Sequence, residues 1–349
     1  MAEAIPAESG RHSRFWLYTP LILLLLVAAA WSVAWFVIRN RAAETLDAWI
    51  VSEKRIGRHW TCTDRTIAGY PFRIEIVCGA LSLKQGAVTA SFGRTEAIAQ
   101  VYQPRLVIAE VAGPLHVSDG KVTVQGRWDL LQASIHASQA GLQRLSIAAN
   151  APKVTVTGLL PQEIATSGQH LELHLRPNPS RASENAYDAA LSVKQASIPQ
   201  LDALIGGTEL TDLNADATAT QTADFQGRPL AQELERWRGA GGVLDVLMLS
   251  VTKGPRRLEA KGQLNLDGEH RPAGQLNVAA AGLDGLIGNI TGNRTGGALL
   301  GALLGQNPRA RDKTGAQPPV AQLPPLSLNN GFLAMGPFVI PNFRLQPLY

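Results

Sequence analysis

Hydrophobic residues are grouped along this chain in two ways, as one long run near the start and as many short runs afterwards. Residues 15–38 contain no charged side chain, and a helix of this length can cross the hydrocarbon layer of a membrane, which is about 30 Å thick. Aromatic residues stand near both ends of the run and arginines flank it, as is typical of membrane-spanning helices. We therefore predict a transmembrane signal anchor at 15–38, preceded by a cytoplasmic tail at 1–14.

Two other interpretations of the long run compete with an anchor. A buried core helix is seldom this long without a charge. A cleaved secretory signal also begins with basic residues and an apolar run, but its apolar part is shorter, and no A-x-A cleavage pattern follows this run before Arg39. Residues 39–58 then keep a helical spacing of apolar side chains. We expect a helical stalk there that holds the rest of the chain away from the bilayer.

Short alternating runs follow, and they predict strands. Apolar and polar residues alternate in runs such as 105–111, 153–160 and 170–177, which is the pattern of strands that have one covered and one solvated face. Gly, Pro, Asn or Asp separates many of these runs, as in an antiparallel meander. We predict a mainly β fold, in which the transmembrane helix is followed by a curved antiparallel β-sheet domain with a few short helices, spanning residues 59–305.

The C-terminal part differs in composition from the predicted sheet. Residues 306–325 are rich in Pro, Gln and charged side chains, a composition that favours a flexible linker. Residues 326–349 return to short apolar runs around Asn330-Gly331, a dipeptide that favours a tight hairpin turn. We predict a C-terminal β-hairpin followed by one strand.

The two cysteines, Cys62 and Cys78, lie on either side of one predicted turn. Residues 60–67 and 72–81 are expected to form two strands around Gly69-Tyr70-Pro71. If Ala68 pairs with Phe72, Cys62 lies opposite Cys78 with Cα atoms about 5 Å apart, within disulfide range. We predict a disulfide, which requires an oxidising compartment. The alternative is a pair of buried free thiols.

Charge gives conflicting information about location and little about binding. The net charge is +4 over 349 residues, with Lys and Arg scattered, so nothing indicates nucleic-acid binding. Basic residues are more frequent after the apolar run than before it, which favours a cytoplasmic main domain by the positive-inside rule. The predicted disulfide favours the opposite orientation, and large domains translocate despite such charges.

The strongest candidates for chemistry are His170, Glu172 and His174. On a strand they share one face, but the two histidines are then about 13 Å apart, too far to share a metal ion. Asp202 and Asp284 recur in the repeated segments LDALIG and LDGLIG, where helix-end hydrogen bonding is the expected role. We find no nucleophile elbow, P-loop or H-E-x-x-H motif. We therefore expect no enzyme, no catalytic or metal-binding residue, and no cofactor.

Two sets of motifs resemble known families. The turn Gly69-Tyr70-Pro71-Phe72 with Cys78, behind an anchor and a Trp-containing helix, resembles the bacterial family called domain of unknown function 2125. So do the ending motifs at 323–328, 330–331 and 336–337, and the resemblance covers nearly the whole chain. No catalytic residues are described for that family, so the resemblance implies none.

Residues 262–268 and 274–278, followed by the LDGLIG turn, are similar to the AsmA-like inner-membrane proteins of Gram-negative bacteria. That similarity implies a periplasmic, curved β-sheet trough linked to outer-membrane assembly or phospholipid movement. A chain of 349 residues is too short to span the periplasm alone, as the long members of that group are proposed to do.

These observations give two functional hypotheses. The first is a single-pass inner-membrane protein whose periplasmic sheet has a groove that binds lipid acyl chains and acts in envelope homeostasis. The second is a structural or assembly factor that binds other envelope proteins, without lipid, through sheet edges or residues 332–340. The expected partners are thus the membrane and either a phospholipid or an envelope protein.

Overall fold

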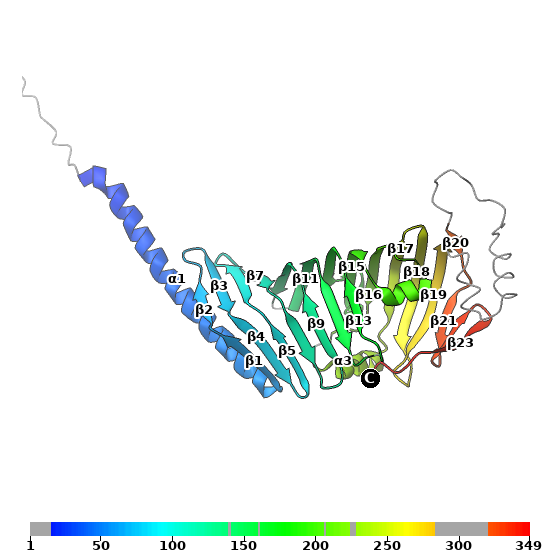
Figure 1. Ribbon diagram of the computed structural model, residues 1–349. Helices are drawn as coiled ribbons and strands as arrows, with labels where there is room; N and C mark the ends of the chain where they lie inside the picture. Colours follow the sequence, from blue (N-terminus) through cyan, green and yellow to red (C-terminus); the bar gives the residue numbers. More distant parts are fainter. Residues whose placement is uncertain (1–14, 139–140, 160, 206, 224–227, 283–319) are drawn as a thin grey trace, which may run out of the picture.

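The computed structural model describes residues 15–138, 141–159, 161–205, 207–223, 228–282 and 320–349 (Figure 1). The predicted tail at 1–14, the repeat copy with Asp284 and residues 306–319 of the predicted linker lie outside the described residues. Strands account for 54% of the residues, they pair antiparallel, and the sheets stay open instead of closing into a barrel. The predicted mainly β fold with an N-terminal helix and a few short helices is therefore confirmed.

One helix, α1 (Phe15–Arg55), forms the N-terminal part of the structure. It is long and apolar enough to cross a membrane, and the rest of the structure buries 6% of its most apolar 18-residue stretch. A core helix would be covered by the rest of the molecule, so this exposure is inconsistent with that alternative. The helix runs without interruption through both the apolar run and the following amphipathic segment.

The strands form two sheets, which we call the short sheet and the long sheet. In spatial order, the short sheet contains β1 (Arg58–Thr63), β4 (Ala80–Gln85), β5 (Val88–Phe92), β8 (Leu115–Ser118), β9 (Thr123–Arg127), β12 (Lys153–Thr157) and β13 (Ile164–Ser167). The long sheet has sixteen strands: β2 (Thr66–Ala68), β3 (Arg73–Cys78), β6 (Thr95–Gln100), β7 (Gln103–Val111), β10 (Leu130–Ser138), β11 (Gly141–Asn150), β14 (His170–Pro177), β15 (Tyr187–Ala196), β16 (Thr211–Ala219), β17 (Leu244–Lys253), β18 (Arg256–Leu266), β19 (Pro272–Ala281), β21 (Leu326–Asn329), β22 (Phe332–Met335) and β23 (Phe338–Arg344), with β20 (Ala321–Gln322) paired to β19.

Up to β14 the chain passes repeatedly from one sheet to the other, and the connections are short. Single strands of the long sheet continue into strands of the short sheet through one to three residues, and we call this line of connections the crease. It comprises residues 64–65, 79, 93–94, 112–114, 128–129, 151–152 and 168–169. Hydrogen bonds continue across it, for example from Gly79 N to Thr63 O at 2.8 Å and from Gly168 N to Pro152 O at 2.9 Å. A strand of the long sheet and the strand of the short sheet that continues it thus form one long strand, and the hairpins made of such strands bend near their middle.

Glycine is required at one point of the crease. A Cβ atom on Gly93 would lie 2.5 Å from the carbonyl oxygen of Gly113, closer than two such atoms can approach. The two arms of one bent hairpin approach each other there, and the approach is possible because Gly93 carries no side chain.

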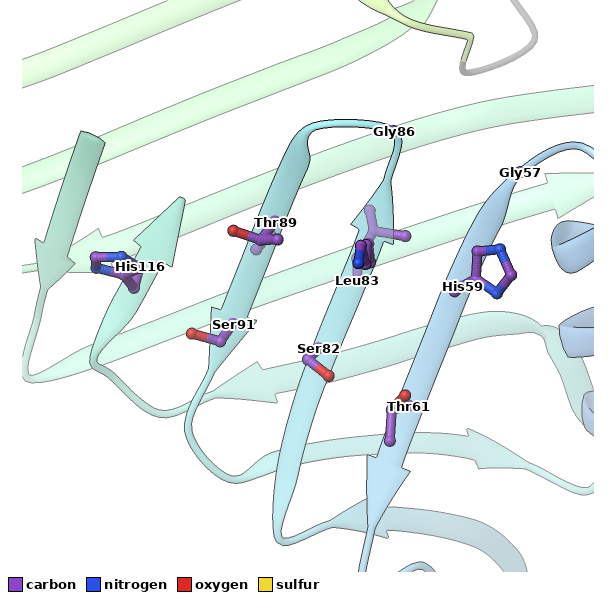
Figure 2. A pocket seen from close by; sticks show the side chains of 11 residues that line it. Gly57, His59, Thr61, Ser82, Leu83, Gly86, Thr89, Ser91 and His116 are labelled. Atoms are coloured by element: carbon purple, nitrogen blue, oxygen red, sulfur yellow. The ribbon is translucent and has the colours of Figure 1, made fainter. Parts of the chain in front are cut away.

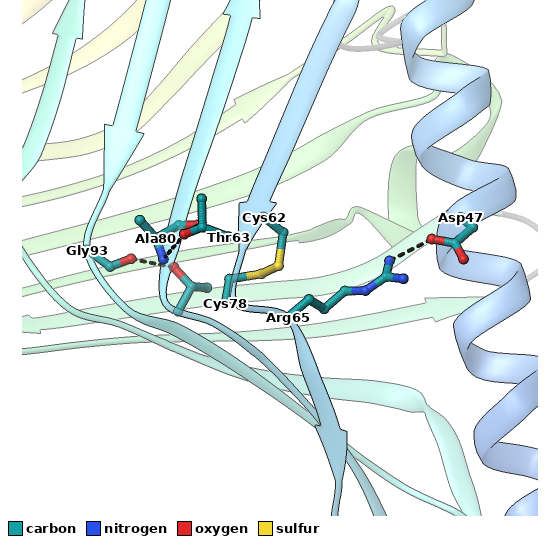
Figure 3. Close-up of a disulfide and its surroundings, with 8 residues drawn as sticks. Asp47, Cys62, Thr63, Arg65, Cys78, Ala80 and Gly93 are labelled. Atoms are coloured by element: carbon teal, nitrogen blue, oxygen red, sulfur yellow. Dashed lines mark hydrogen bonds and ion pairs between the residues drawn. A yellow bond between two sulfur atoms is a disulfide. The ribbon is translucent and has the colours of Figure 1, made fainter.

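The disulfide between Cys62 and Cys78 is present, but its setting differs from the predicted one (Figure 3). Ala68 pairs with Glu75 and not with Phe72, so the expected hairpin register is wrong by three positions. Cys62 lies in β1 of the short sheet and Cys78 ends β3 of the long sheet. Their Cα atoms are 5.2 Å apart. The bridge therefore joins the two sheets beside the crease instead of closing one hairpin.

The predicted strand at 60–67 is also wrong, because it divides between the two sheets. Asp64 adopts a positive φ of 49° between β1 and β2, a conformation that interrupts a strand. The next residue, Arg65, forms an ion pair with Asp47 of α1 at 2.6 Å (Figure 3).

The predicted stalk at 39–58 is mostly part of α1, and it packs against the sheets instead of standing apart from them. Near its C-terminal end, α1 contacts β1 through Glu53, which receives hydrogen bonds from Arg58 at 2.5 Å and Trp60 at 3.1 Å. The Arg58 guanidinium holds the pKa of the buried Glu53 carboxyl below its usual value, although burial acts in the other direction. Trp49 packs on Trp60 with ring centroids 5.8 Å apart. The helix therefore lies along the edge of both sheets.

Candidate functional site: the apolar inner faces of the two sheets

The strand register aligns apolar side chains in a row across the long sheet. The row consists of residues that pair with one another from β3 to β19, and it contains no polar side chain: Ile76, Ala97, Ala109, Ala133, Ile147, Leu173, Leu191, Ala215, Leu249, Ala260 and Val278. We call this the long row, and the face that carries it the inner face. Alternation along each strand places the neighbouring positions on the opposite, outer face.

The outer face of the long sheet is more polar than the inner face, although it also carries Val77 and Ile108. One row beside the long row has mostly charged or amide and hydroxyl side chains: Glu96, Glu110, Gln132, Ala148, Glu172, Ser192, Asn214, Ser250, Glu259 and Ala279. The contrast between the two rows shows which face of this sheet is apolar.

The short sheet repeats this arrangement over all seven strands. Its apolar row, the short row, is Trp60, Leu83, Ala90, Val117, Val124, Val156 and Ile164. Cys62 lies on the same face as this row, two residues after Trp60, and Cys78 lies on the same face as Ile76 of the long row. Because a disulfide joins these two cysteines, the inner faces of both sheets meet at the crease.

The inner faces are only partly covered. Among the described residues, every leucine keeps part of its surface exposed, including Leu173, Leu191 and Leu249 of the long row. The fully buried apolar residues are mostly alanines, with few large side chains. A filled core would bury its leucines first. From β3 to β17 the long row thus presents an apolar surface that the described part of the chain leaves partly accessible, whereas Ala260 and Val278 at its far end are buried.

A buried ion pair connects α2 to the end of β17, at one end of the inner face. The side chain of Lys253, at the end of β17, is 1% exposed, and its Nζ donates to Asp202 Oδ1 at 2.6 Å and to the carbonyl oxygen of Glu209. Asp202 lies in α2 (Pro199–Ile205), which packs beside β13. In place of the helix-end hydrogen bond expected for it, Asp202 thus forms an ion pair that docks α2 onto the long sheet.

The candidate residues His170, Glu172 and His174 share the outer face, as the alternation predicts. Glu172 lies between the two histidines, with Oε1 3.0 Å from His170 Nε2 and Oε2 3.5 Å from His174 Nε2. These two contacts, the one to His170 first, lower the pKa of Glu172. The remaining ring nitrogens contact Asn150 at 2.7 Å and Ser146 at 2.9 Å. The group is a hydrogen-bonded network on the polar face.

A cavity of about 820 Å³ lies on the outer face of the short sheet (Figure 2). Its labelled polar side chains, among them His59, Thr61, Ser91 and His116, point from β1, β4, β5 and β8 to the same side. No carboxylate lines this cavity. Across the described ranges, no group of three or more His, Cys, Asp or Glu side chains could hold a metal ion. This surface offers hydroxyl and imidazole groups, but no acid–base pair with a carboxylate.

Sequence reasoning found the alternation within each strand but missed both rows. A row depends on which strands pair and in what register, and these pairings join segments far apart in the sequence. Glycines at positions 79, 93 and 168, inside or beside apolar runs, were the signal that could have indicated the crease.

Comparison with known proteins identifies one family. The family model described as "Uncharacterized protein conserved in bacteria (DUF2125)" matches residues 35–342. The match begins inside α1, so it includes nearly all of both sheets and leaves out most of the apolar run. Searches of curated proteins and of solved structures found no match.

Proposed function

The chain belongs to this conserved bacterial family, DUF2125, and on that premise we propose that it is a single-pass inner-membrane protein whose periplasmic sheets bind lipid acyl chains on their inner faces. Such a protein would act in maintenance of the cell envelope. The proposal assigns no reaction and no cofactor to the chain.

The observation that carries the proposal is the uninterrupted long row with its partly exposed leucines. Neighbouring strands are about 4.8 Å apart, so a row across eleven strands extends roughly 48 Å. One acyl chain fills about half of a bilayer's hydrocarbon layer, or roughly 15 Å. The row is thus long enough for more than one acyl chain. Removing such a surface from water is favourable for both the protein and the lipid.

The periplasmic location is supported by the disulfide, because bacterial disulfides persist in the periplasm and are reduced in the cytoplasm. The basic residues after the apolar run argue for the opposite orientation. We give the disulfide more weight, since a large folded domain translocates largely regardless of nearby charge.

Photo-crosslinking in cells tests the proposal directly. Cells that express the full chain are grown with a photoactivatable fatty acid, which they incorporate into phospholipid, and the crosslinked peptides are located by mass spectrometry. We expect lipid adducts on strands β14 to β17 in addition to those on α1. Adducts confined to α1 would contradict acyl-chain binding by the sheets.

Matched variants sharpen this test. Leu191→Asp places a charge on the long row, whereas Ser192→Asp places the same charge one residue later on the outer face. The first variant should lose adducts on the sheets, and the second should keep them. Equal loss in both would indicate a general disturbance of β15, and equal retention would count against the inner face.

A second candidate function is favoured by the last strand of the long sheet. Phe338 and Val339 begin β23, the final strand in the order of the sheet, and both are more than half exposed. An edge strand with exposed apolar side chains can pair with another protein chain. A photoreactive residue at position 338 that yields a specific protein adduct, in cells where the sheets give no lipid adduct, would favour this assembly role. The AsmA-like similarity fits the first candidate and stays a prediction.

A further inference from the structure

The turn between β2 and β3 contacts α1 inside its apolar run. Trp31 Nε1 donates to the carbonyl oxygen of Pro71 at 3.0 Å, and the ring of Trp31 lies 6.0 Å from that of Phe72. Ser32 Oγ and the hydroxyl of Tyr70 are 2.8 Å apart. The end of the long sheet is therefore attached to residues that the membrane anchor itself contains.

The free part of α1 is too short to span a membrane. Figure 1 shows the N-terminal part of α1 projecting past the ends of β2 and β3. The sixteen helical residues that precede Trp31 extend about 24 Å at 1.5 Å per residue. The hydrocarbon layer is about 30 Å thick, and tilt would shorten the span further. Arg14 precedes the helix, so the apolar run does not extend in the other direction. The bilayer must then reach beyond Trp31, to the level of the turn.

The side chains at that level are suited to a membrane interface. Phe72 is 60% exposed and Tyr102, in the next turn of the same sheet, is 73% exposed. The two turns are linked by a hydrogen bond from Val101 N to Phe72 O at 3.0 Å. With Tyr70, these residues form an exposed aromatic group, which we call the aromatic tip. Tyrosine and other amphipathic aromatic side chains concentrate at the boundary between lipid tails and headgroups.

Arginines lie on the other side of the tip from the free N-terminal part of α1. Arg39 donates from Nε to the carbonyl oxygen of Ile67 in β2 at 3.1 Å. Arg73 and Arg105, in the strands that leave the two turns, have exposed side chains. Side chains of this type can reach headgroup phosphates. The order of apolar helix, aromatic tip and arginines matches the order of hydrocarbon, interface and headgroups.

We propose that the aromatic tip, Tyr70, Phe72 and Tyr102, is inserted in the interfacial layer of the same bilayer that holds α1, so that the long sheet begins inside the membrane surface. The inserted tip brings the half-buried Ile76, on the inner face beyond the turn, close to the membrane surface. The inference rests on the membrane anchor of the proposed function and adds a second membrane contact to it.

Nitroxide labels measure the depth of each site in the full chain. Because both native cysteines are in the disulfide, one introduced cysteine is a unique labelling site. The variants are Phe72→Cys and Tyr102→Cys, with Leu159→Cys as a control that is 61% exposed at the far end of the short sheet and Leu24→Cys as a control that is 63% exposed in α1. Each protein is reconstituted in vesicles of phosphatidylethanolamine and phosphatidylglycerol. Collision rates with oxygen, which is enriched in lipid, and with a water-soluble nickel complex are then compared.

We expect the oxygen-to-nickel ratio at Phe72 and Tyr102 to be several-fold higher than at Leu159 and lower than at Leu24. If Leu24 is lipid-exposed while Phe72 and Tyr102 match Leu159, insertion of the tip is overturned and the anchor stands. If Leu24 also matches Leu159, the anchor itself fails. Tyr102 does not contribute to the Trp31 contact, so its label reports depth even if the label at Phe72 disturbs that contact.

Discussion

The same apolar row crosses two regions of the molecule that cover it differently. In the two-sheet region, β1 to β14, most hairpins bend at the crease. One half of each bent hairpin belongs to the long sheet and the other half to the short sheet. In the one-sheet region, β15 to β23, the strands stay in the long sheet and have no counterpart in the short sheet. After β15 the chain instead enters α2. The bend adds a second apolar row without burying the first, because Ile76 and Leu173 of the long row stay half-buried in the two-sheet region, whereas Ala260 and Val278 are buried in the one-sheet region.

The two regions are also held by different interactions. The two-sheet region has a disulfide and the buried contact of Glu53 with Arg58 and Trp60. The one-sheet region has the ion pair of Lys253 with Asp202, and the packing of α3 (Leu230–Gly239) through Trp237. If the regions are independent, a substitution in one should leave local stability in the other unchanged. Hydrogen exchange of the full chain in micelles, compared for β3–β4 and β16–β17, measures this.

The largest expected effect is that of Trp237→Ala. Trp237 is buried, its Nε1 donates to the carbonyl oxygen of Thr220 at 2.7 Å, and Gly242 leaves space for its ring. Removing a buried indole should destabilise the one-sheet region by about 3–5 kcal/mol, with lost protection in β16 and β17. Leu230→Ala, at the exposed N-terminal end of the same helix, should change stability by less than about 0.5 kcal/mol. Equal loss of protection in β3 and β4 would contradict independent regions.

Removing the disulfide should act on the other region. Cys78→Ser frees a loop whose ends are 16 residues apart, and we expect a loss of about 3 kcal/mol of stability, because the unfolded chain regains the entropy of that loop. Protection should fall in β1, β3 and β4 and stay unchanged in β17. Thiol labelling of the denatured, unreduced wild-type protein from intact envelopes provides the control. Two labelled thiols would show that the bridge is absent in cells and would remove the main argument for a periplasmic location.

The ion pair in the one-sheet region should have a smaller effect. Asp202→Leu leaves the buried ammonium group of Lys253 with the Glu209 carbonyl oxygen as its remaining acceptor, and we expect a loss of about 2 kcal/mol. The double variant Asp202→Leu with Lys253→Met removes the unpaired charge and should recover part of that loss. A double variant that is less stable than Asp202→Leu alone would contradict this explanation. Urea unfolding in micelles gives both values.

The smallest expected effect concerns pH and the C-terminal residue. Hydrogen bonds from Arg238 and then Tyr349 lower the pKa of Glu235 from 4.5 to about 2. Because the folded state lowers this pKa, the ionised carboxylate of Glu235 stabilises the fold above pH 4.5. This contribution is lost as the pH falls toward 2 and the carboxylate is protonated. Fluorotyrosine at position 349, which stacks on His270 at 4.4 Å, should therefore show a shift change in that pH range. The change should be absent in Glu235→Gln, and a titration that persists there would exclude Glu235 as its cause.

The sequence alone determined the features that depend on neighbouring residues. An uncharged run of helical length predicted α1, because each apolar residue adds to the same transfer free energy wherever the sheets lie. Alternation predicted the strands and their polar and apolar faces, since the side-chain period of a strand is a property of its own backbone.

Tertiary structure decided everything that depends on which segments meet. Residues 72–83 form one alternating run in the sequence, yet Gly79 divides them between the long sheet and the short sheet. Cys62 and Cys78 are joined across the two sheets, with a hairpin register that counting outward from the turn did not give. A helix expected to hold the sheets away from the membrane contacts them from Trp31 onward. These outcomes depend on hydrogen bonds and packing between distant residues, for which a local pattern carries no information about partner or register.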